Sequence, residues 1–227
     1  MTAPVPDPGG EAARRAYRRE GYAQLGDVLA EDRVARLEAE ALRLYERWAP
    51  ARGHGLRRPA DTASAPVTFD DVGALSVLFN ELAHDVEPAL WAARVLGGPV
   101  EPVRIALTYA PPHSPPPPLA PASPRQPAGS MPDDGVHLWI PLQRDGSWHL
   151  RVALRSHTRD ASLPRRGWSR WWAGRRARVG GCGGSGPCVV AVHPLLRIGT
   201  GQNQSRYLRV SAVLTYRRPE PGDIPWP

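Results

Sequence analysis

Nine of the 17 residues from 111 to 127 are proline. Proline fixes φ and has no backbone N–H, so this stretch cannot hold a regular helix or a central β-strand. It therefore divides the chain into two parts that must be interpreted separately. The part before it is mostly helical in pattern, and the part after it consists of short strand-like segments.

Helical spacing is clearest in residues 32–48, where apolar side chains recur three or four positions apart at Val34, Leu37, Ala41, Leu44, Tyr45 and Trp48. Residues 11–20 have the charged composition of a second helix, and residues 21–29 read as a short strand and turn. The segment 72–97 predicts two short helices joined near Glu87 and Pro88, because proline is tolerated in a first helical turn and Gly97 ends the second helix.

Strand-like segments dominate the rest of the chain. They are rich in β-branched and aromatic residues, are bounded by turn residues, and lie at 100–110, 136–143, 148–154, 188–196 and 207–217. Helices followed by antiparallel strands indicate an α+β fold with a sandwich or barrel as its second layer. We predict a disordered lead over 1–10 and one domain over 11–227, with a helical layer at about 11–98 and barrel strands at about 99–218.

The formal charge is +7, and all 29 basic residues are arginine. Either a GC-rich bacterial genome or selection for anion binding explains this bias.

No apolar run approaches the ~20 residues of a membrane span, and the N-terminus has no apolar signal-peptide core, so we expect a cytoplasmic protein with no membrane partner. Reduced thiols are the favoured state of Cys182 and Cys188, and no further cysteine supports a zinc site.

Three segments together resemble a known family: REGYAQLGDVLAEDRVARLEAEALRL, DGVHLWIPLQRDGSWHLRVALRSH and HPLLRIGTGQNQSRYLRVSAVLTY. Their order and spacing are similar to those of the phytanoyl-CoA dioxygenase family of Fe(II)/2-oxoglutarate oxygenases, over about two thirds of the chain. The resemblance implies a double-stranded β-helix, which is a jelly-roll, cupin-like barrel, flanked by N-terminal helices.

The resemblance also implies a metal site that this sequence lacks. The family holds Fe(II) with two histidines and one carboxylate, and the first two ligands form a His-x-Asp or His-x-Glu pair. None of the seven histidines here is followed two residues later by an acidic residue. His113 stands near the place of the pair, with Pro115 in the acidic position, and Ile198 takes the place of the distal histidine. We therefore expect no metal and no cofactor. Fe(II) and 2-oxoglutarate would be cofactors only if the metal ligands were atypical.

The resemblance implies that this sequence keeps the anion-binding half of the family site. Arg209 stands where the family has the arginine that pairs with the 2-oxoglutarate carboxylate, and the period of a strand puts it on one face with Ser211, Val213 and Thr215. A guanidinium beside a hydroxyl can grip a carboxylate. The alternative is a surface arginine on an edge strand. The predicted substrate-binding residues are Arg209, Ser211, Trp139, Arg197 and His113.

Four residues are candidates for acid–base chemistry in the barrel. His137 shares a strand face with Trp139, Asp134 lies in the turn before that strand, His193 lies at the end of another strand, and Tyr109 ends a strand that enters the proline-rich stretch. The alternatives are a buried or surface histidine, an ordinary turn acid and a half-buried tyrosine.

Six arginines and three tryptophans lie between residues 165 and 178. We expect an exposed excursion there between two barrel strands. A lid over an anionic substrate ranks first, and a patch for a homodimer or heterodimer partner ranks second, because Trp and Arg dominate interface hot spots. Nucleic-acid binding ranks last because no nucleic-acid motif accompanies the segment.

These observations favour a metal-independent enzyme of bacterial specialised metabolism that transforms a small anionic substrate in the barrel by cyclisation, elimination or isomerisation. One alternative is a non-catalytic partner or binding subunit of an active oxygenase. The other is a hydroxylase that uses Fe(II) and 2-oxoglutarate with atypical ligands. Fold similarity does not decide among them, because function depends on the site.

Overall fold

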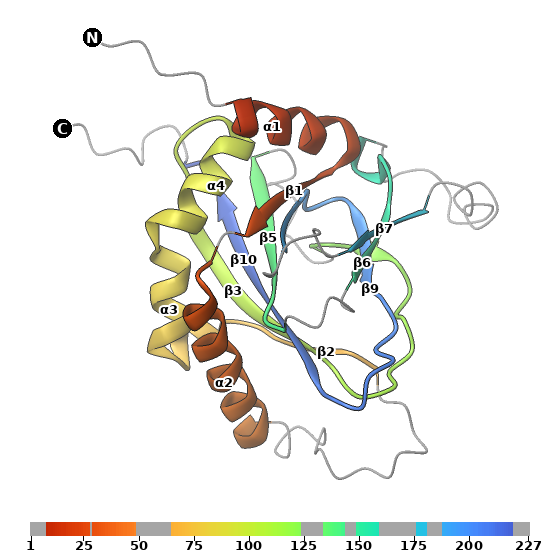
Figure 1. Ribbon diagram of the computed structural model, residues 1–227. Coiled ribbons are helices and arrows are strands. Elements are labelled where there is room, and N and C mark those ends of the chain that lie inside the picture. The colour runs from red at the N-terminus through yellow and green to blue at the C-terminus, as the bar shows by residue number, and fades with distance from the viewer. Residues whose placement is uncertain are drawn as a thin grey trace.

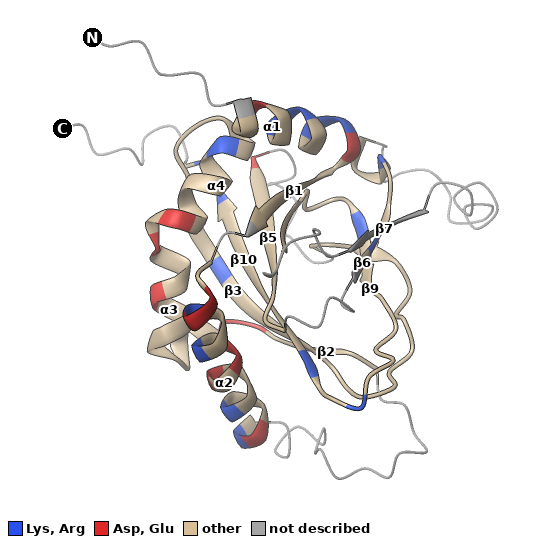
Figure 2. Cartoon of the chain, viewed as in Figure 1, with Lys and Arg blue, Asp and Glu red and all other residues tan. Residues whose placement is uncertain are grey.

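The computed structural model describes residues 8–27, 29–48, 65–123, 134–143, 149–158, 176–180 and 188–219. Within these ranges the chain forms two antiparallel sheets, and the helices lie beside the larger sheet (Figure 1). The helices are α1 (Pro8–Glu20), α2 (Glu31–Trp48), α3 (Val77–His84) and α4 (Val86–Leu96). Charged residues are concentrated on these helices, and most of the strand surface is uncharged (Figure 2).

The larger sheet has six strands in the order β1-β8-β5-β10-β3-β2. Their bounds are Tyr22–Asp27 for β1, Cys188–Val192 for β8, Gly135–Pro141 for β5, Arg209–Arg217 for β10, Glu101–Ala110 for β3 and Val67–Phe69 for β2. The longest pairing joins β10 to β3, from Arg209 opposite Ala110 to Arg217 opposite Glu101. Both strands of this ladder are internal, because β5 flanks β10 and β2 flanks β3.

The smaller sheet has the order β4-β9-β6-β7, with β4 at Ala120–Pro121, β9 at Arg197–Thr200, β6 at His149–Ala153 and β7 at Arg176–Gly180. The proline-rich stretch contributes only the two-residue strand β4, which lies at the edge of this sheet. An edge strand needs ladder hydrogen bonds on one side only, so it tolerates proline. For residues 111–123, which the structure describes, the prediction that this stretch holds no central strand is confirmed.

Buried side chains form two clusters, one on each face of the larger sheet. On the outer face, alternate residues of β10 and β3 pack against the helices, among them Leu214 and Tyr109. On the inner face, Trp139 and Val213 meet Ile198 and Val152 of the smaller sheet. Because successive side chains of a strand point to opposite faces, this second cluster marks the interior of the barrel.

The predicted helix at 32–48 is confirmed, since α2 buries the apolar residues that recur at helical spacing. The two short helices at 72–97 are also found, and their junction lies at Asp85, whose side chain accepts a hydrogen bond from the backbone N–H of Glu87. Such an N-cap satisfies a donor that the first helical turn leaves open. Gly97, with φ of 80°, ends α4.

Other expectations need correction. Helix α1 begins at Pro8, inside the segment predicted as a disordered lead. Most of the segment 165–178 lies outside the described residues, but Arg176–Gly180 forms β7 and pairs with β6, so the end of that segment is a strand and not an excursion. Cys188 is buried and disulfide-bonded, whereas a free thiol was favoured; Cys182 lies outside the described residues.

In the described part of the chain, no helix combines the length and the apolar character that crossing a bilayer requires.

Candidate functional site

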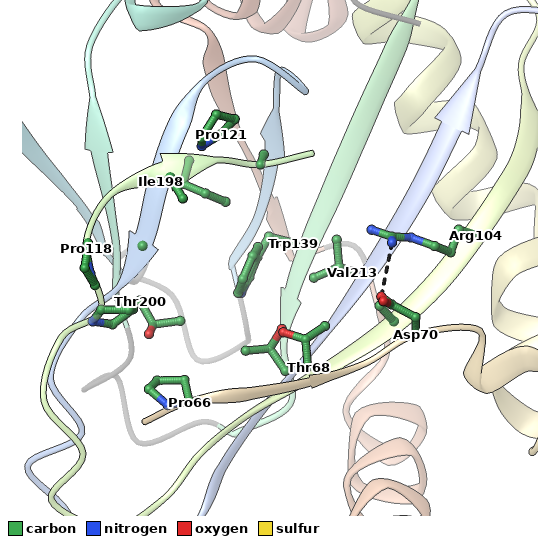
Figure 3. Close-up of a pocket in the computed structure, with 16 residues that line it drawn as sticks. Pro66, Thr68, Asp70, Arg104, Pro118, Pro121, Trp139, Ile198, Thr200 and Val213 are labelled. Atoms are coloured by element: carbon green, nitrogen blue, oxygen red, sulfur yellow. Dashed lines mark hydrogen bonds and ion pairs between the residues drawn. The ribbon is translucent and has the colours of Figure 1, made fainter. Parts of the chain in front are cut away.

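A cavity of about 350 Å³ lies between the two sheets (Figure 3). The larger sheet contributes side chains from β2, β3, β5 and β10 to its wall, and the smaller sheet contributes β4 and β9 with the chain just before β4. Its lining is Pro66, Thr68, Asp70, Arg104, Ala106, Thr108, Pro117, Pro118, Ala120, Pro121, Ala122, Trp139, Ile198, Gly199, Thr200 and Val213. A concave space of this size suits a small organic ligand.

The polar side of the cavity lies mainly on the larger sheet. Arg104 Nη1 donates a hydrogen bond of 3.1 Å to Asp70 Oδ1, and these side chains are 34% and 55% exposed (Figure 3). Beside this ion pair the hydroxyl oxygens of Thr68 and Thr108 are 3.2 Å apart. Across the cavity, Thr200 Oγ1 is buried and has no hydrogen-bond partner among the described residues. These groups can bind an anionic or hydroxyl-bearing ligand.

His137 lies on the same inward face of β5 as Trp139, but it is not in the lining of the cavity. Its Nε2 is 2.6 Å from Ser123 Oγ, and its Nδ1 is 2.9 Å from Thr215 Oγ1. Burial, helped by the charges of Arg104 and His193, lowers the pKa of His137 to about 3. At neutral pH the ring is therefore neutral, with one nitrogen donating and the other accepting. This arrangement ties β5 and β10 to the chain after β4, and both ring nitrogens of His137 already have hydrogen-bond partners.

Arg209 and Ser211 face the interior of the barrel, on the same face as Val213. Arg209 is only 5% exposed, and Ser211 Oγ is buried with no hydrogen-bond partner among the described residues. Neither residue lines the cavity, although Ser211 is the register partner of Thr108, which does. Arg209 has an interaction partner within the chain, so its burial alone does not require a bound anion.

Tyr109 lies on the outer face of the larger sheet, and His193 follows the end of β8; neither lines the cavity. The hydroxyl of Tyr109 donates to the carbonyl of Ala41 in α2, at 2.8 Å, and burial raises the pKa of Tyr109. His193 lies against the rings of Tyr17 and His157, and burial and His157 lower its pKa to about 4. Neither residue lines the described cavity, and their role in catalysis stays a prediction.

Three further predicted residues also lie away from the cavity. Asp134 is at the far end of β5 and pairs with Arg218 at 3.6 Å. Arg197 is adjacent to Ile198 on β9 and so points to the opposite face, where its Nη2 donates to the carbonyl of Leu119. His113 is exposed, in a turn with φ of 57°. Of the predicted substrate-binding residues, Trp139 alone lines the described cavity.

Sequence reasoning did not single out Asp70, Arg104 or the threonines of the cavity. Arg104 was open to detection, because it is a lone charged residue in the otherwise apolar segment 103–107 and shares the two-residue period of Ala106 and Thr108. Asp70 and Thr68 carried no such signal. They join the site only because β2 pairs with β3.

Comparison with solved structures identifies the fold of this chain. No protein-family model matches the sequence, and no curated protein matches it. Among solved structures, AviO1 from Streptomyces viridochromogenes Tue57 is 28% identical, with a TM-score of 0.68 and complete coverage of both chains. SnoN, an epimerase solved with Fe³⁺, α-ketoglutarate and nogalamycin RO, is 20% identical, with a TM-score of 0.64 over 97% of this chain and 94% of its own. SnoK, a non-haem α-ketoglutarate-dependent carbocyclase, is 18% identical, with a TM-score of 0.73 over 94% of this chain and 87% of its own.

The chain has the fold of the iron/2-oxoglutarate oxygenases. The jelly-roll barrel with flanking helices that the resemblance implied is therefore present.

The residues around Ile198 do not fit the iron of this oxygenase fold. Ile198 lines the cavity at the position that the resemblance assigns to the distal histidine, and an alkyl group supplies no ligand atom. The described residues contain no group of three or more His, Cys, Asp or Glu side chains that could hold a metal ion. The carboxylate half of the oxygenase site fits better, because the Ser211 hydroxyl is buried without a described partner on the inward face that also carries Arg209.

Proposed function

We propose that this chain is an enzyme of bacterial specialised metabolism that transforms a small anionic substrate without a metal ion, by cyclisation, elimination or isomerisation. The observation that carries the proposal is the composition of the cavity. One wall has an ion pair and hydroxyl groups, and the other has Ile198 at the position of a metal ligand.

The names of the similar structures support the assignment of this chain to specialised metabolism. SnoK is a carbocyclase and SnoN an epimerase, both from nogalamycin biosynthesis. Both are described as dependent on α-ketoglutarate. In this proposal the reaction of the present chain differs from theirs in how the reacting carbon is activated, and Ile198 at the position that the resemblance assigns to a ligand supports that difference.

We propose the following roles for the polar residues of the cavity. Arg104 binds the anionic group of the substrate, since a guanidinium fork matches carboxylate and phosphate oxygens. Asp70, held 3.1 Å from Arg104, is placed to accept or return a proton as the reaction proceeds. Thr68, Thr108 and Thr200 orient the substrate by hydrogen bonding, and Trp139 covers it with an apolar ring. Arg209 with Ser211 is a second candidate for holding a carboxylate deeper in the barrel.

Metal dependence is the first test. Purified protein is reconstituted anaerobically with Fe(II), desalted and analysed for iron, and succinate production from 2-oxoglutarate is then measured. We expect substoichiometric iron and no iron-dependent succinate. Stoichiometric iron or iron-dependent turnover of 2-oxoglutarate would show instead a hydroxylase with atypical ligands.

Anion binding is the second test, with metal-free 2-oxoglutarate as a dicarboxylate probe in ligand-observed NMR. We expect the wild type to bind the probe and the Arg104→Gln variant to lose most of that binding. The Arg36→Gln variant is the matched control, because Arg36 lies in an exposed i,i+4 ion pair on α2, away from the cavity. Equal binding by wild type and Arg104→Gln would show that Arg104 does not bind the anion. Absence of probe binding by the wild type would contradict the proposal that the substrate is anionic.

A further inference from the structure

The strand register identifies the neighbours of Ile198 inside the barrel. Strand β4 pairs with β9 along the edge of the smaller sheet, and the register partner of Ile198 is Ala120. Two residues further along the chain, Ala122 packs against the same interior cluster as Ile198. All three side chains line the cavity. Three alkyl side chains therefore surround one corner of the cavity.

The spacing of these residues matches the metal triad that the resemblance implies. That triad consists of a His-x-acid pair and a distal histidine, which bind one ion together. Ile198 stands at the distal position, and Ala120 and Ala122 are separated by one residue, as the members of a His-x-acid pair are. Residues two apart point to one face of an extended chain, so both can approach the same point. His113 cannot supply this pair, because it is exposed in a turn and does not line the cavity.

We propose that Ala120, Ala122 and Ile198 occupy the three ligand positions of the oxygenase fold and form there an apolar subsite, which takes an alkyl or aromatic part of the substrate. The proposal rests on the proposed function and adds the orientation of the substrate to it. Burial of Ile198, which is 8% exposed, makes this corner favourable for a hydrocarbon group. The anionic end of the substrate then faces Arg104 across the cavity.

The positions are tested by building the absent triad. The variant Ala120→His/Ala122→Asp/Ile198→His is titrated with Co(II) under visible absorption spectroscopy. We expect about one equivalent of cobalt bound, with no comparable binding by the wild type. The matched control is Ala120→His/Ala122→Asp/Arg197→His, which has the same three ligand types but places the last one on the outer face of β9.

The outcomes separate this inference from the proposed function. Cobalt binding by the triple variant and not by its control supports the assigned positions. If the triple variant does not fold, Ala120→His/Ile198→His is compared with Ala120→His/Arg197→His by titration with Ni(II). Folded variants that bind no more metal than their controls overturn the assignment. Stoichiometric iron in the wild type refutes the metal-independent function instead, and leaves the comparison between variant and control to decide the positions.

The subsite itself is tested with 1-anilinonaphthalene-8-sulfonate, a probe that has an aromatic body and one anionic group. We expect saturable fluorescence enhancement with the wild type and about tenfold weaker binding by Ile198→Asn, since an aromatic ring that covers the amide prevents it from hydrogen-bonding to water. Ile198→Leu, which keeps the corner apolar, should bind like the wild type. Equal affinity of Ile198→Asn and wild type, or no binding by the wild type, overturns the subsite.

Discussion

His137 makes the stability of the folded chain sensitive to acid. The ring is 1% exposed and hydrogen-bonded at both nitrogens, and its pKa falls from 6.5 to about 3 on folding. Below pH 6.5 the unfolded chain therefore takes up a proton on His137 that the folded chain does not. Because the unfolded state binds more protons, the free energy of unfolding decreases as the pH falls from 6.5 towards 3, and the full contribution is present only above pH 6.5.

The size of this effect follows from the pKa difference. One pKa unit corresponds to about 1.4 kcal/mol, so lowering the pH from 7 to 4.5 removes about 2.5 kcal/mol of stability through His137 alone. Native domains have only about 5–15 kcal/mol in total, so this loss is large. His193, whose pKa is lowered to about 4, contributes in the same direction. A variant that changes His137 alone therefore isolates its share.

The variant is His137→Gln, because a side-chain amide can still donate and accept hydrogen bonds between Ser123 and Thr215 but does not titrate. Urea unfolding is followed by circular dichroism from pH 7 to 4.5. We expect the wild type to be more stable at pH 7, and the difference from His137→Gln to shrink by about 2.5 kcal/mol by pH 4.5. The control is His113→Gln, at an exposed histidine. Parallel pH profiles for the wild type and His137→Gln, or an NMR titration of His137 near pH 6.5, would refute the reasoning.

Three further predictions concern single side chains. Tyr109→Phe removes the hydrogen bond to Ala41 and should lower the free energy of unfolding by about 1 kcal/mol, measured by urea unfolding, with no change in probe binding. Gly21→Ala should cost about 2 kcal/mol or more in the same assay, because Gly21 has φ of 86° and a Cβ there would lie 2.4 Å from His157 Nδ1. Arg209→Leu should weaken binding of metal-free 2-oxoglutarate through the carboxylate that Arg104 does not hold, with the circular dichroism spectrum unchanged; loss of the folded spectrum would make Arg209 structural instead.

Elements with a strong local period were predictable from the sequence. The apolar spacing in α2 survives as its buried face, and the alternation in β10 correctly places Arg209, Ser211 and Val213 on one side of the strand. Strand β7 was missed because its residues were taken as part of the arginine- and tryptophan-rich segment 165–178, although RARV alternates polar and apolar side chains as a strand does. Its pairing is determined by the partner β6. Local sequence contains no information about such a partner.

The composition of the cavity was harder to predict, for a related reason. Residues 105–110 of β3 are buried on both faces of the sheet, so the sequence does not show which of Thr108 and Tyr109 faces the barrel. The ion pair between Asp70 and Arg104 joins residues 34 positions apart and depends on the register of β2 against β3. His137 was assigned to catalysis because an isolated histidine on a strand looks alike whether it is solvated or locked between two hydroxyls.

The unequal length of the strands around the cavity affects how this protein can change during evolution. One wall rests on the β10–β3 ladder, where a substitution disturbs the packing of the sheet on the helices as well as the cavity. The opposite wall rests on β4, which has only two residues, lies at a sheet edge and has proline on both sides. Prolines keep that segment extended, and among the described strands it pairs only with β9, so its side chains can be exchanged with little effect on the rest of the fold. Selection for a new substrate would therefore act first on residues 117–122, and the ion-paired wall would be the slower of the two to change.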